Sequence, residues 1–526
     1  MYVKRKETDL TLLVGGTEMP RLSSKRTALH YVHLLIPIFF VLLIGCGDVQ
    51  SARTDSSNKS PYVSILAPLH FPQQPSKEVI AELERLTGVE LDIRWVPEGV
   101  YTDKMNTALT TNSLAKVTFV KFTDYSVVKN AIKSGDFWEI EPYLAEFPNL
   151  SQLSPSILRQ TAVEGKIYGL YTERPSSRQG IIIRKDWLDN LGLEEPRTLE
   201  DLYDVLKQFT YNDPDQNGKQ DTIGLVDRND LVYGVFKTLS SYFGTPNNWE
   251  LAGDQLIPEF ETEEYMNTMN FMKKLYDEKL INQDFALTSK ELQRDSFIRG
   301  SAGVYIGSMT DVQRLSIETQ ALHPKAELAL INRIHGPKGY KVWSIPNYNG
   351  LYLFSKKAIA TEEELKEVLA FFDRTMDKDV ANLMMYGVEG RHYEIVGGKV
   401  ILPEETSRLR VDEVNPLYSL MIANMSNTNI LEVVQKEELT AAAERLSEDN
   451  ESFLVVDPTV YLSSDTFDEK NAELSQIITD ATYNYILGKI TVEGFKNETL
   501  KWRQNGGDLI IQEYEEALLR ERLRNN

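Results

Sequence analysis

A short acidic loop, Asp213 to Asp221, has the residue types and the spacing that bind a hard cation. Its sequence DPDQNGKQD matches D-x-[DN]-x-[DN]-G, the first half of a calcium loop of the EF-hand type, in which alternate residues point inward and the glycine permits a sharp turn. The expected ligands are the side chains of Asp213, Asp215 and Asn217, the backbone carbonyl of Lys219, and Asp221 directly or through water. The sequence therefore predicts a structural Ca²⁺ site.

This calcium loop is incomplete, because its twelfth position is Gly224 where an EF-hand has a bidentate glutamate. A further ligand would have to come from elsewhere, such as the carbonyl of Thr222 or the side chain of Asp227. Asp, Pro, Asn and Gly are also the residues that favour turns, so an ordinary surface turn is the alternative interpretation.

Cys46 is the only cysteine of the chain, and it closes an apolar run. Lys25 and Arg26 precede the run Leu34 to Ile44, which is too short for a permanent membrane helix and is typical of a signal peptide. Gly45 before Cys46 is similar to the lipobox of bacterial lipoproteins. We therefore expect residues 1–46 to form a lipoprotein signal peptide, with Met1 or Met19 as the start, and the Cys46 thiol to carry the lipid, palmitate included; the alternative is an uncleaved anchor.

The chain is strongly acidic, with 57 Lys and Arg against 78 Asp and Glu and a net charge of −21. Such a field repels nucleic acid and anionic headgroups, so we expect no nucleic-acid partner and contact with the membrane through the lipid alone. A single cysteine cannot form an internal disulfide. The length that remains after residue 46 favours two domains over one.

Motifs of common enzyme classes are missing from the sequence. There is no G-x-S-x-G elbow, H-E-x-x-H zinc motif or G-x-x-x-x-G-K-[ST] phosphate loop. The histidines outside the signal region, His70, His323, His335 and His392, have no metal-ligand spacing. The sequence thus predicts a protein that is not an enzyme, although a pair of carboxylates would suffice for a secreted glycoside hydrolase.

Hydrophobic patterns predict an α/β fold that begins with a parallel sheet. Residues 47–60 are small and polar and are typical of a flexible tether. The first folded segment reads β-α-β-α-β, with strands over 62–66, 89–96 and 117–121 and helices over 76–87 and around 104–111.

The alternation continues, and capping boxes that begin at Thr198 and Thr361 predict two helix starts. Further predicted elements are strands at 181–183 and 303–306 and helices at 187–191 and 263–280, before a C-terminal part that is mostly helical in pattern.

Several short segments occur in a characteristic order: EGKIYGL (164–170), IRKDWLDNLGL (183–193), PRTLEDL (196–202), the calcium loop, KLY (274–276) with LI (280–281), RG (299–300) with Gly303, and YGVEGRHY (386–393). In this order, behind a lipobox, the chain resembles the extracellular solute-binding proteins of ABC importers, the family 1 lipoproteins of Gram-positive bacteria. The stretch 112–117 departs from the segment that many relatives carry there, so the resemblance does not extend to the identity of the ligand.

The resemblance implies a two-lobed, periplasmic-binding-protein-like fold of type II, similar to maltose-binding protein, with an interlobe cleft that closes on the ligand by a hinge. Mapped onto this chain, it places the first α/β lobe at 61–173 and 305–360. The second α/β lobe, with the helical C-terminal part, falls at 174–304 and 361–526.

Sugar-binding clefts combine aromatic faces with planar polar groups. Position relative to the expected crossing between the lobes selects these candidate ligand-binding residues: Tyr168, Tyr171, Arg174, Arg178, Trp249, Trp343 and Tyr348. For each aromatic residue the alternative is ordinary core packing, and the two arginines could instead be solvated or paired across the hinge. If both arginines line the cleft, an acidic sugar such as a uronide is favoured.

The function that the resemblance implies is capture of an oligosaccharide or related solute for an ABC importer, by a monomer held by its lipid on the extracellular face of a Gram-positive cell membrane. Its partners would be the small-molecule solute and the permease subunits of the importer. A ligand-sensing lipoprotein that signals through a membrane kinase would have the same fold, and it stays open as an alternative.

Overall fold

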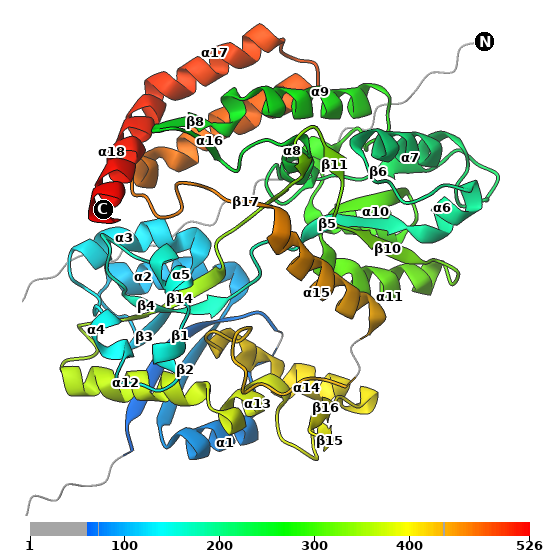
Figure 1. Cartoon of the computed structure of the whole chain (residues 1–526). Coiled ribbons are helices and arrows are strands. Elements are labelled where there is room, and N and C mark those ends of the chain that lie inside the picture. Colours follow the sequence, from blue (N-terminus) through cyan, green and yellow to red (C-terminus); the bar gives the residue numbers. More distant parts are fainter. Residues whose placement is uncertain (1–59, 72, 435–436, 526) are drawn as a thin grey trace, which may run out of the picture. The chain divides into compact units, whose positions relative to one another are not determined.

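The computed structural model describes residues 60–71, 73–434 and 437–525. The predicted signal peptide, Cys46 and nearly all of the predicted tether lie outside these residues. The described chain forms two α/β lobes, each built around one larger β-sheet (Figure 1). The expectation of a two-lobed α/β fold is therefore confirmed.

The sheet of the first lobe has five strands in the order β2-β1-β3-β14-β4. Strands β1 (Tyr62–Leu69), β2 (Glu90–Pro97) and β3 (Val117–Lys121) are parallel, as the sequence predicts. Strand β14 (Tyr348–Phe354) runs antiparallel between β3 and β4 (Gly169–Glu173). The carboxyl ends of β1, β2, β3 and β4 and the amino end of β14 consequently share one edge of the sheet.

Local signals in the sequence account for these elements. Ser76 caps helix α1 (Lys77–Thr87) by accepting a hydrogen bond from the Val79 N–H, and Gly88 ends it with a left-handed φ of 70°. The second helix, α2 (Glu98–Thr110), begins directly after β2, six residues before the predicted start at 104. Its apolar periodicity is weak, because only Tyr101 and Met105 are buried.

The sheet of the second lobe has four strands in the order β10-β5-β9-β6. Strand β5 (Gln179–Arg184) is buried along its whole length and is antiparallel to both β9 (Ala302–Ser308) and β10 (Leu328–Ile331). Strand β6 (Ile223–Leu225) is parallel to β9. The amino end of β5 and the carboxyl ends of β6 and β9 therefore share an edge.

Capping residues begin the two helices that the sequence predicts from them. Thr198 and Asp201 form a complete capping box at the start of α7 (Leu199–Tyr211). Thr361 caps α12 (Glu362–Thr375), while the Glu364 carboxylate accepts from the N–H of Ala360.

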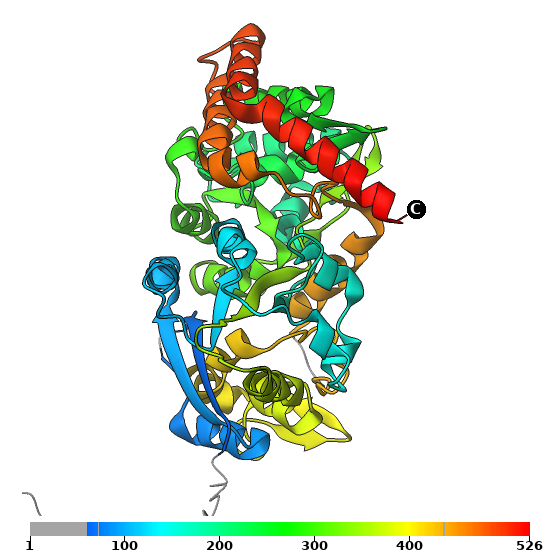
Figure 2. The same ribbon diagram turned by 90° about the vertical axis from the view of Figure 1, so that its left-hand side faces the viewer.

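The remaining elements group around the two sheets, and Figure 2 shows the blue, cyan and yellow segments together and the green, orange and red segments together. Around the first sheet lie α3 (Tyr125–Lys133), α4 (Glu141–Leu144), α5 (Pro155–Gln160), α13 (Lys378–Tyr386), α14 (Ser407–Glu413) and the hairpin of β15 (Glu394–Val396) and β16 (Lys399–Ile401). Around the second lie α6 (Lys185–Leu191), α8 (Val235–Phe243), β7 (Trp249–Ala252), β8 (Gln255–Pro258), α9 (Glu263–Asp277), α10 (Lys290–Ile298), α11 (Val312–Leu322), α15 (Glu438–Asn450), α16 (Asp465–Ile486), α17 (Val492–Trp502) and α18 (Asp508–Asn525).

Two connections between the sheets are short segments of irregular structure. Residues 174–178 join β4 to β5, and residues 332–347 join β10 to β14. The second connection contains β11 (His335–Gly336), β12 (Gly339–Tyr340) and β13 (Val342–Trp343), and β13 pairs with β17 (Leu454–Val455).

The lobe boundaries expected from the sequence differ from this grouping in two segments. Residues 305–331 belong to the second lobe, because β9 and β10 pair with β5. Residues 361–423 belong to the first lobe, because α12, α13 and the segment up to Ala423 pack into the same hydrophobic core as β1 and β14. Periodicity shows that a helix has an apolar face, but not which sheet covers it.

Candidate functional site

The shared strand edges carry the candidate site, as expected for α/β proteins, which bind ligands beyond the carboxyl ends of their strands. On the first sheet, Phe122 follows β3, Arg174 follows β4 and Tyr348 begins β14. On the second, Arg178 precedes β5, and its carbonyl accepts a hydrogen bond from the Met309 N–H (2.8 Å), just past β9.

Arg174 is held at this junction by its backbone and by one guanidinium nitrogen. Its N–H donates to the Asn347 carbonyl (3.0 Å), its Nε donates to the Pro346 carbonyl (3.0 Å), and its guanidinium lies 5.1 Å from the centre of the Phe122 ring. Nη2 is buried and has no hydrogen-bond partner among the described residues. Burial lowers the pKa of Arg174, and the like charge of Arg178 lowers this pKa further. The phenol of Tyr233 has the opposite effect and raises it.

Arg178 is the second arginine with an unused donor, because its Nε is buried and also lacks a hydrogen-bond partner among the described residues. Two arginines that are buried as whole residues do form ion pairs: Arg184 pairs with Asp186 at 2.6 Å, although its Nη1 also lacks a hydrogen-bond partner among the described residues, and Arg228 pairs with Asp230 at 3.1 Å. Within the described ranges, no carboxylate forms such an ion pair with Arg174 or Arg178. A buried donor that stays unpaired costs about 1–3 kcal/mol, so this pair of cations is suited to an anionic group from outside the chain.

Four aromatic residues lie in the same region as these arginines, and they contact each other in pairs. Phe122 and Tyr348 meet edge to face with ring centres 5.5 Å apart, and Tyr233 lies 5.8 Å from Trp343. Trp343 and Tyr348 are each 3% exposed, whereas Tyr233 is 39% exposed. The Trp343 indole N–H donates to Thr238 Oγ1 (3.0 Å), which fixes the ring. We call the six residues Phe122, Arg174, Arg178, Tyr233, Trp343 and Tyr348 the junction cluster.

Four of the seven predicted ligand-binding residues thus come together in the junction cluster, and two of its members, Phe122 and Tyr233, were not predicted. Phe122 directly follows the predicted strand 117–121, so its place at a carboxyl strand end is a signal that the sequence does contain. Tyr233 lies beyond β6, whose three residues are too few to produce a pattern.

A network of buried polar groups holds the loop that carries Tyr233. Asp227 Oδ1 accepts from the N–H groups of Arg228 (2.7 Å) and Val235 (2.9 Å), the first residue of α8. The Arg228 guanidinium donates to the Gln293 side chain (3.0 Å) and to the Tyr233 carbonyl. Burial raises the pKa of Asp227 to about 7, although its hydrogen bonds act in the opposite direction.

The other three predicted ligand-binding residues lie elsewhere. Tyr171 is fully buried in the first core, where its hydroxyl accepts from the Ser154 N–H (2.9 Å). Tyr168 precedes β4, at the end of that strand opposite Arg174, and packs on the same core. Trp249 begins β7 and packs against Trp502 and Tyr514 of the C-terminal helices. Tyr171 and Trp249 are thus buried by core packing, the alternative considered from the sequence, whereas Tyr168 is only partly buried.

The predicted calcium loop lies between α7 and β6. The Asp213 carboxylate accepts from the N–H groups of Asn217 (3.1 Å) and Gly218 (3.0 Å), and the Asn217 amide donates to Asp215 (2.8 Å) and Asp221 (3.1 Å). Gly218 has a φ of 80°. The loop thus gathers three carboxylates around Asn217, two of them on its side-chain amide and one on its backbone N–H, and their oxygen atoms are of the hard type that Ca²⁺ prefers.

The carboxylates of this loop are not arranged as a complete set of metal ligands. Among the residues that the structure describes, no group of three or more His, Cys, Asp or Glu side chains is placed as metal ligands. Asp227, considered as an extra ligand, is occupied with the loop that carries Tyr233.

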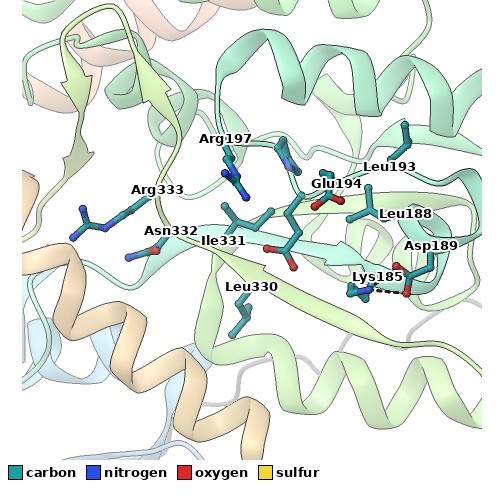
Figure 3. Close-up of a pocket in the computed structure, with 12 residues that line it drawn as sticks. Lys185, Leu188, Asp189, Leu193, Glu194, Arg197, Leu330, Ile331, Asn332 and Arg333 are labelled. Atoms are coloured by element: carbon teal, nitrogen blue, oxygen red, sulfur yellow. Dashed lines mark hydrogen bonds and ion pairs between the residues drawn. The ribbon is translucent and has the colours of Figure 1, made fainter.

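A separate pocket of about 410 Å³ lies on the second lobe (Figure 3). It is formed by α6, residues 193–197 and the edge strand β10 with the two residues that follow it. Its lining is largely charged, with Lys185, Asp189, Glu194, Arg197 and Arg333, and it contains no aromatic residue. We assign the candidate site to the junction cluster, because aromatic rings gather there at the shared strand edges around Arg174, which forms no ion pair among the described residues.

None of the helices in the described part of the chain is both long and apolar enough to cross a bilayer.

Comparison with known proteins gives matches over nearly the whole chain. The chain is 43% identical over 495 residues to the polygalacturonan/rhamnogalacturonan-binding protein YtcQ of Bacillus subtilis, covering 92% of this chain and 98% of that protein. It is 34% identical over 487 residues to the lipoprotein LipO of the same organism, covering 91% and 96%.

Solved structures show the same fold. The Streptococcus pneumoniae ABC-transporter substrate-binding protein FusA, in the structure of an EF-hand mutant with fructo-nystose, superposes with a TM-score of 0.66 at 16% identity and covers 88% of this chain and 100% of that one. The family model described as bacterial extracellular solute-binding protein matches residues 72–371. The resemblance found in the sequence is confirmed, and the chain belongs to the family of bacterial extracellular solute-binding proteins, which bind solutes and are not enzymes.

Proposed function

We propose that this protein captures an acidic oligosaccharide of the pectin type outside the cell and delivers it to the permease of an ABC importer. The name of YtcQ, 43% identical over 92% of the chain, supports the ligand class, since polygalacturonan is a chain of uronic acid units that each carry a carboxyl group. An acidic sugar of the same chemical class is the ligand expected from the sequence if both arginines line the cleft.

The observation that carries this proposal is the pair of unpaired guanidinium groups in the junction cluster. A uronate carboxylate has two acceptor oxygens in the planar geometry that suits a guanidinium, so it would satisfy the buried donors of Arg174 and Arg178. The chain itself is acidic and supplies no such acceptor there. A neutral sugar would leave the donors without a charged partner.

The aromatic members of the cluster supply the other half of the recognition. Tyr348 and Phe122 belong to the first lobe and Tyr233 to the second, while Trp343 lies in a connection between them. Aromatic faces cover the apolar C–H surfaces of a sugar ring. Hinge closure would bring these rings together over the ligand, and the binding energy would select the closed state that a permease recognises.

The test compares acidic and neutral ligands on a variant of one arginine. Arg178→Gln is expected to weaken the binding of an oligogalacturonide at least tenfold, because it removes one partner of a desolvated charge pair. Binding of a neutral oligogalactoside of equal length should change less than twofold. Isothermal titration calorimetry measures both.

Arg408→Gln is the matched control for this experiment. Arg408 lies on α14, its side chain is 81% exposed, and it pairs with Asp412. This variant should bind like the wild type. Equal affinity of Arg178→Gln and the wild type for the oligogalacturonide would refute the assignment of the carboxylate site.

We propose in addition that the loop 213–221 binds a structural Ca²⁺ ion. The carboxylates of Asp213, Asp215 and Asp221, with the Asn217 side chain and the Lys219 carbonyl, are the oxygen atoms that would hold it. The ion would neutralise a cluster of like charges at the end of α7.

Anchoring by a lipid on Cys46 completes the proposal. The lipobox-like sequence and the 34% identical lipoprotein LipO support it. The protein would then act as a tethered monomer on the extracellular face of the cell membrane, beside its permease.

A further inference from the structure

A second group of polar side chains lies on the same sheet edge as the junction cluster. His70 follows β1, Glu98 follows β2 and Lys121 ends β3, and these three strands are parallel. We call these three residues the polar triad. Nothing in the proposed function assigns a role to them.

The sheet order fixes how far the polar triad lies from Arg174. Along the edge the strands follow each other as β2, β1, β3, β14 and β4, and neighbouring strands are about 4.8 Å apart. The ends of β3 and β4 are therefore separated by about 10 Å, and the ends of β2 and β4 by about 19 Å. A single sugar ring is too short to reach from Arg174 to Glu98.

Aromatic contacts bridge this distance. Phe122 adjoins Lys121 in the chain, packs edge to face on Tyr348 and lies under the guanidinium of Arg174. The edge is thus lined without interruption from the arginine pair to the polar triad.

The polar triad is only partly satisfied by its own contacts. Lys121 Nζ lies 2.5 Å from Glu98 Oε1, and His70 Nδ1 lies 3.2 Å from Glu98 Oε2. The approach of His70 lacks hydrogen-bond geometry, so Glu98 Oε2 is a buried acceptor without a donor among the described residues. Burial also lowers the pKa of His70, which favours the neutral ring.

The surroundings of the triad are open to solvent on one side and rigid on the other. The side chains of His70 and Glu98 are 41% and 42% exposed. Behind them, Tyr101 is fully buried, its hydroxyl lies 2.7 Å from the carbonyl of Phe119, and Lys121 Nζ lies 5.6 Å from the centre of its ring. A partly exposed carboxylate side chain that keeps one oxygen without a hydrogen bond among the described residues, on a fixed support, has the properties of a binding subsite.

We infer that the polar triad is a second subsite of the same elongated binding surface, where Glu98 accepts hydrogen bonds from the hydroxyl groups of a sugar unit several positions away from the carboxylate held by Arg174 and Arg178. The inference rests on the proposed function. If both subsites bind the same ligand, this ligand must be an oligosaccharide, because only a chain of several sugar units is long enough to reach both.

The experiment measures affinity against ligand length. Calorimetric titrations with galacturonic acid and its oligomers of two to six units are made on the wild type, Glu98→Gln and Arg178→Gln. For the wild type, affinity should rise with length until both subsites are filled. Glu98→Gln should bind the shortest bound oligomer like the wild type and lose at least fivefold with the longest, whereas Arg178→Gln should lose at every length.

Two further variants keep the test decisive. His70→Gln changes an exposed residue and should show the same length dependence with a smaller loss. Glu363→Gln, on α12 beyond the carboxyl end of β14 and therefore at the opposite edge, should behave like the wild type. Melting curves establish that each variant is folded.

The outcomes separate the inference from the function on which it rests. If Glu98→Gln and His70→Gln match the wild type at every length, or lose equally at every length, the second subsite is refuted while the proposed function stands. If the wild type binds no oligogalacturonide, the proposed function and the inference both fall.

Discussion

Arg174 and Arg178 stand out among the arginines of this protein because no carboxylate among the described residues forms an ion pair with them, although each keeps a buried nitrogen. Arg184 and Arg228, which are more deeply buried, have aspartate partners two residues further along. The sequence shows the same arginines but cannot show this difference, which depends on what surrounds each guanidinium after folding. At the scale of single residues, the missing carboxylate partner is what distinguishes Arg174 and Arg178, because Arg184 also keeps one buried donor, Nη1, without a hydrogen bond among the described residues.

Asp227 allows a prediction, also at the scale of one residue, about how the stability of the protein depends on pH. Burial raises its pKa to about 7, above the value of about 3.9 that an unfolded chain gives. The buried carboxylate therefore costs stability when it is ionised, and this cost disappears as the native state takes up a proton. Between pH 8 and pH 5 the wild type should gain stability, relative to a variant without this group, as the pH falls.

Asp227→Asn is the variant for this comparison, because its carbonyl oxygen can still accept from Arg228 and Val235. The charged neighbours Arg228 and Asp230 and the phenol of Tyr483 are present in both proteins. Thermal melts across the pH range should give a wild-type-minus-variant difference in Tm that increases toward acid pH. A difference that stays constant or decreases would show that Asp227 is ionised in the native state throughout.

At the scale of elements, the sequence predicts what depends on local pattern. Strand β3 is predicted at its exact bounds, and the capping box at Thr198 begins α7 as expected. The partners of an element are not local: the resemblance to the family placed 305–331 in the first lobe and 361–423 in the second, and the local sequence pattern contains nothing that shows which sheet each segment joins. Gly303 illustrates the point, since a Cβ there would lie 2.3 Å from Phe209, a contact between distant segments.

The candidate site was predictable to the same extent. Arg174 and Tyr348, predicted from strand ends and crossings, do lie at the shared strand edge. Tyr171 instead lies in the core, because the two faces and two ends of a buried strand look alike in sequence, and Trp249 packs on Trp502 and Tyr514, which lie about 250 residues further along the chain.

The loop between α7 and β6 allows a prediction about the effect of Ca²⁺ on thermal stability. Calcium that binds the native state at a hundredfold excess over Kd contributes about 2.7 kcal/mol of stability, so EDTA should lower the melting temperature. Asp215→Ala should remove the difference between the melts in calcium and in EDTA. Asp204→Ala, an exposed change on α7, should keep it.

Using the difference between the two melts, rather than the melting temperature itself, cancels any direct effect of the substitution. Identical curves of the wild type in calcium and in EDTA would mean that the loop is an ordinary turn.

At the scale of the whole molecule, ion pairs connect the two lobes apart from the site. Lys129 and Lys133 on α3 of the first lobe reach Asp468 (3.2 Å) and Asp465 (2.9 Å) at the start of α16 in the second. The Lys129 and Asp468 side chains are 20% and 11% exposed, whereas Asp465 is 80% exposed, so the first pair should contribute more. Hinge opening would break both pairs.

A double-mutant cycle tests this contribution to closure. Lys129→Gln and Asp468→Asn should each weaken ligand binding about two- to fivefold, the range of a partly exposed ion pair, and the double variant should lose no more than either single variant. Additive losses would show that the two residues act independently of each other and do not form a latch between the lobes.

A calorimetric titration of the wild-type protein, in calcium, with an oligogalacturonide and with a neutral oligogalactoside of the same length decides whether the junction cluster recognises an acidic sugar. If the arginine pair binds a carboxylate, the acidic ligand should bind at least tenfold more tightly, and the ligand should be recovered uncleaved. Equal affinity for the two sugars, or binding of the neutral one alone, would contradict the proposed function.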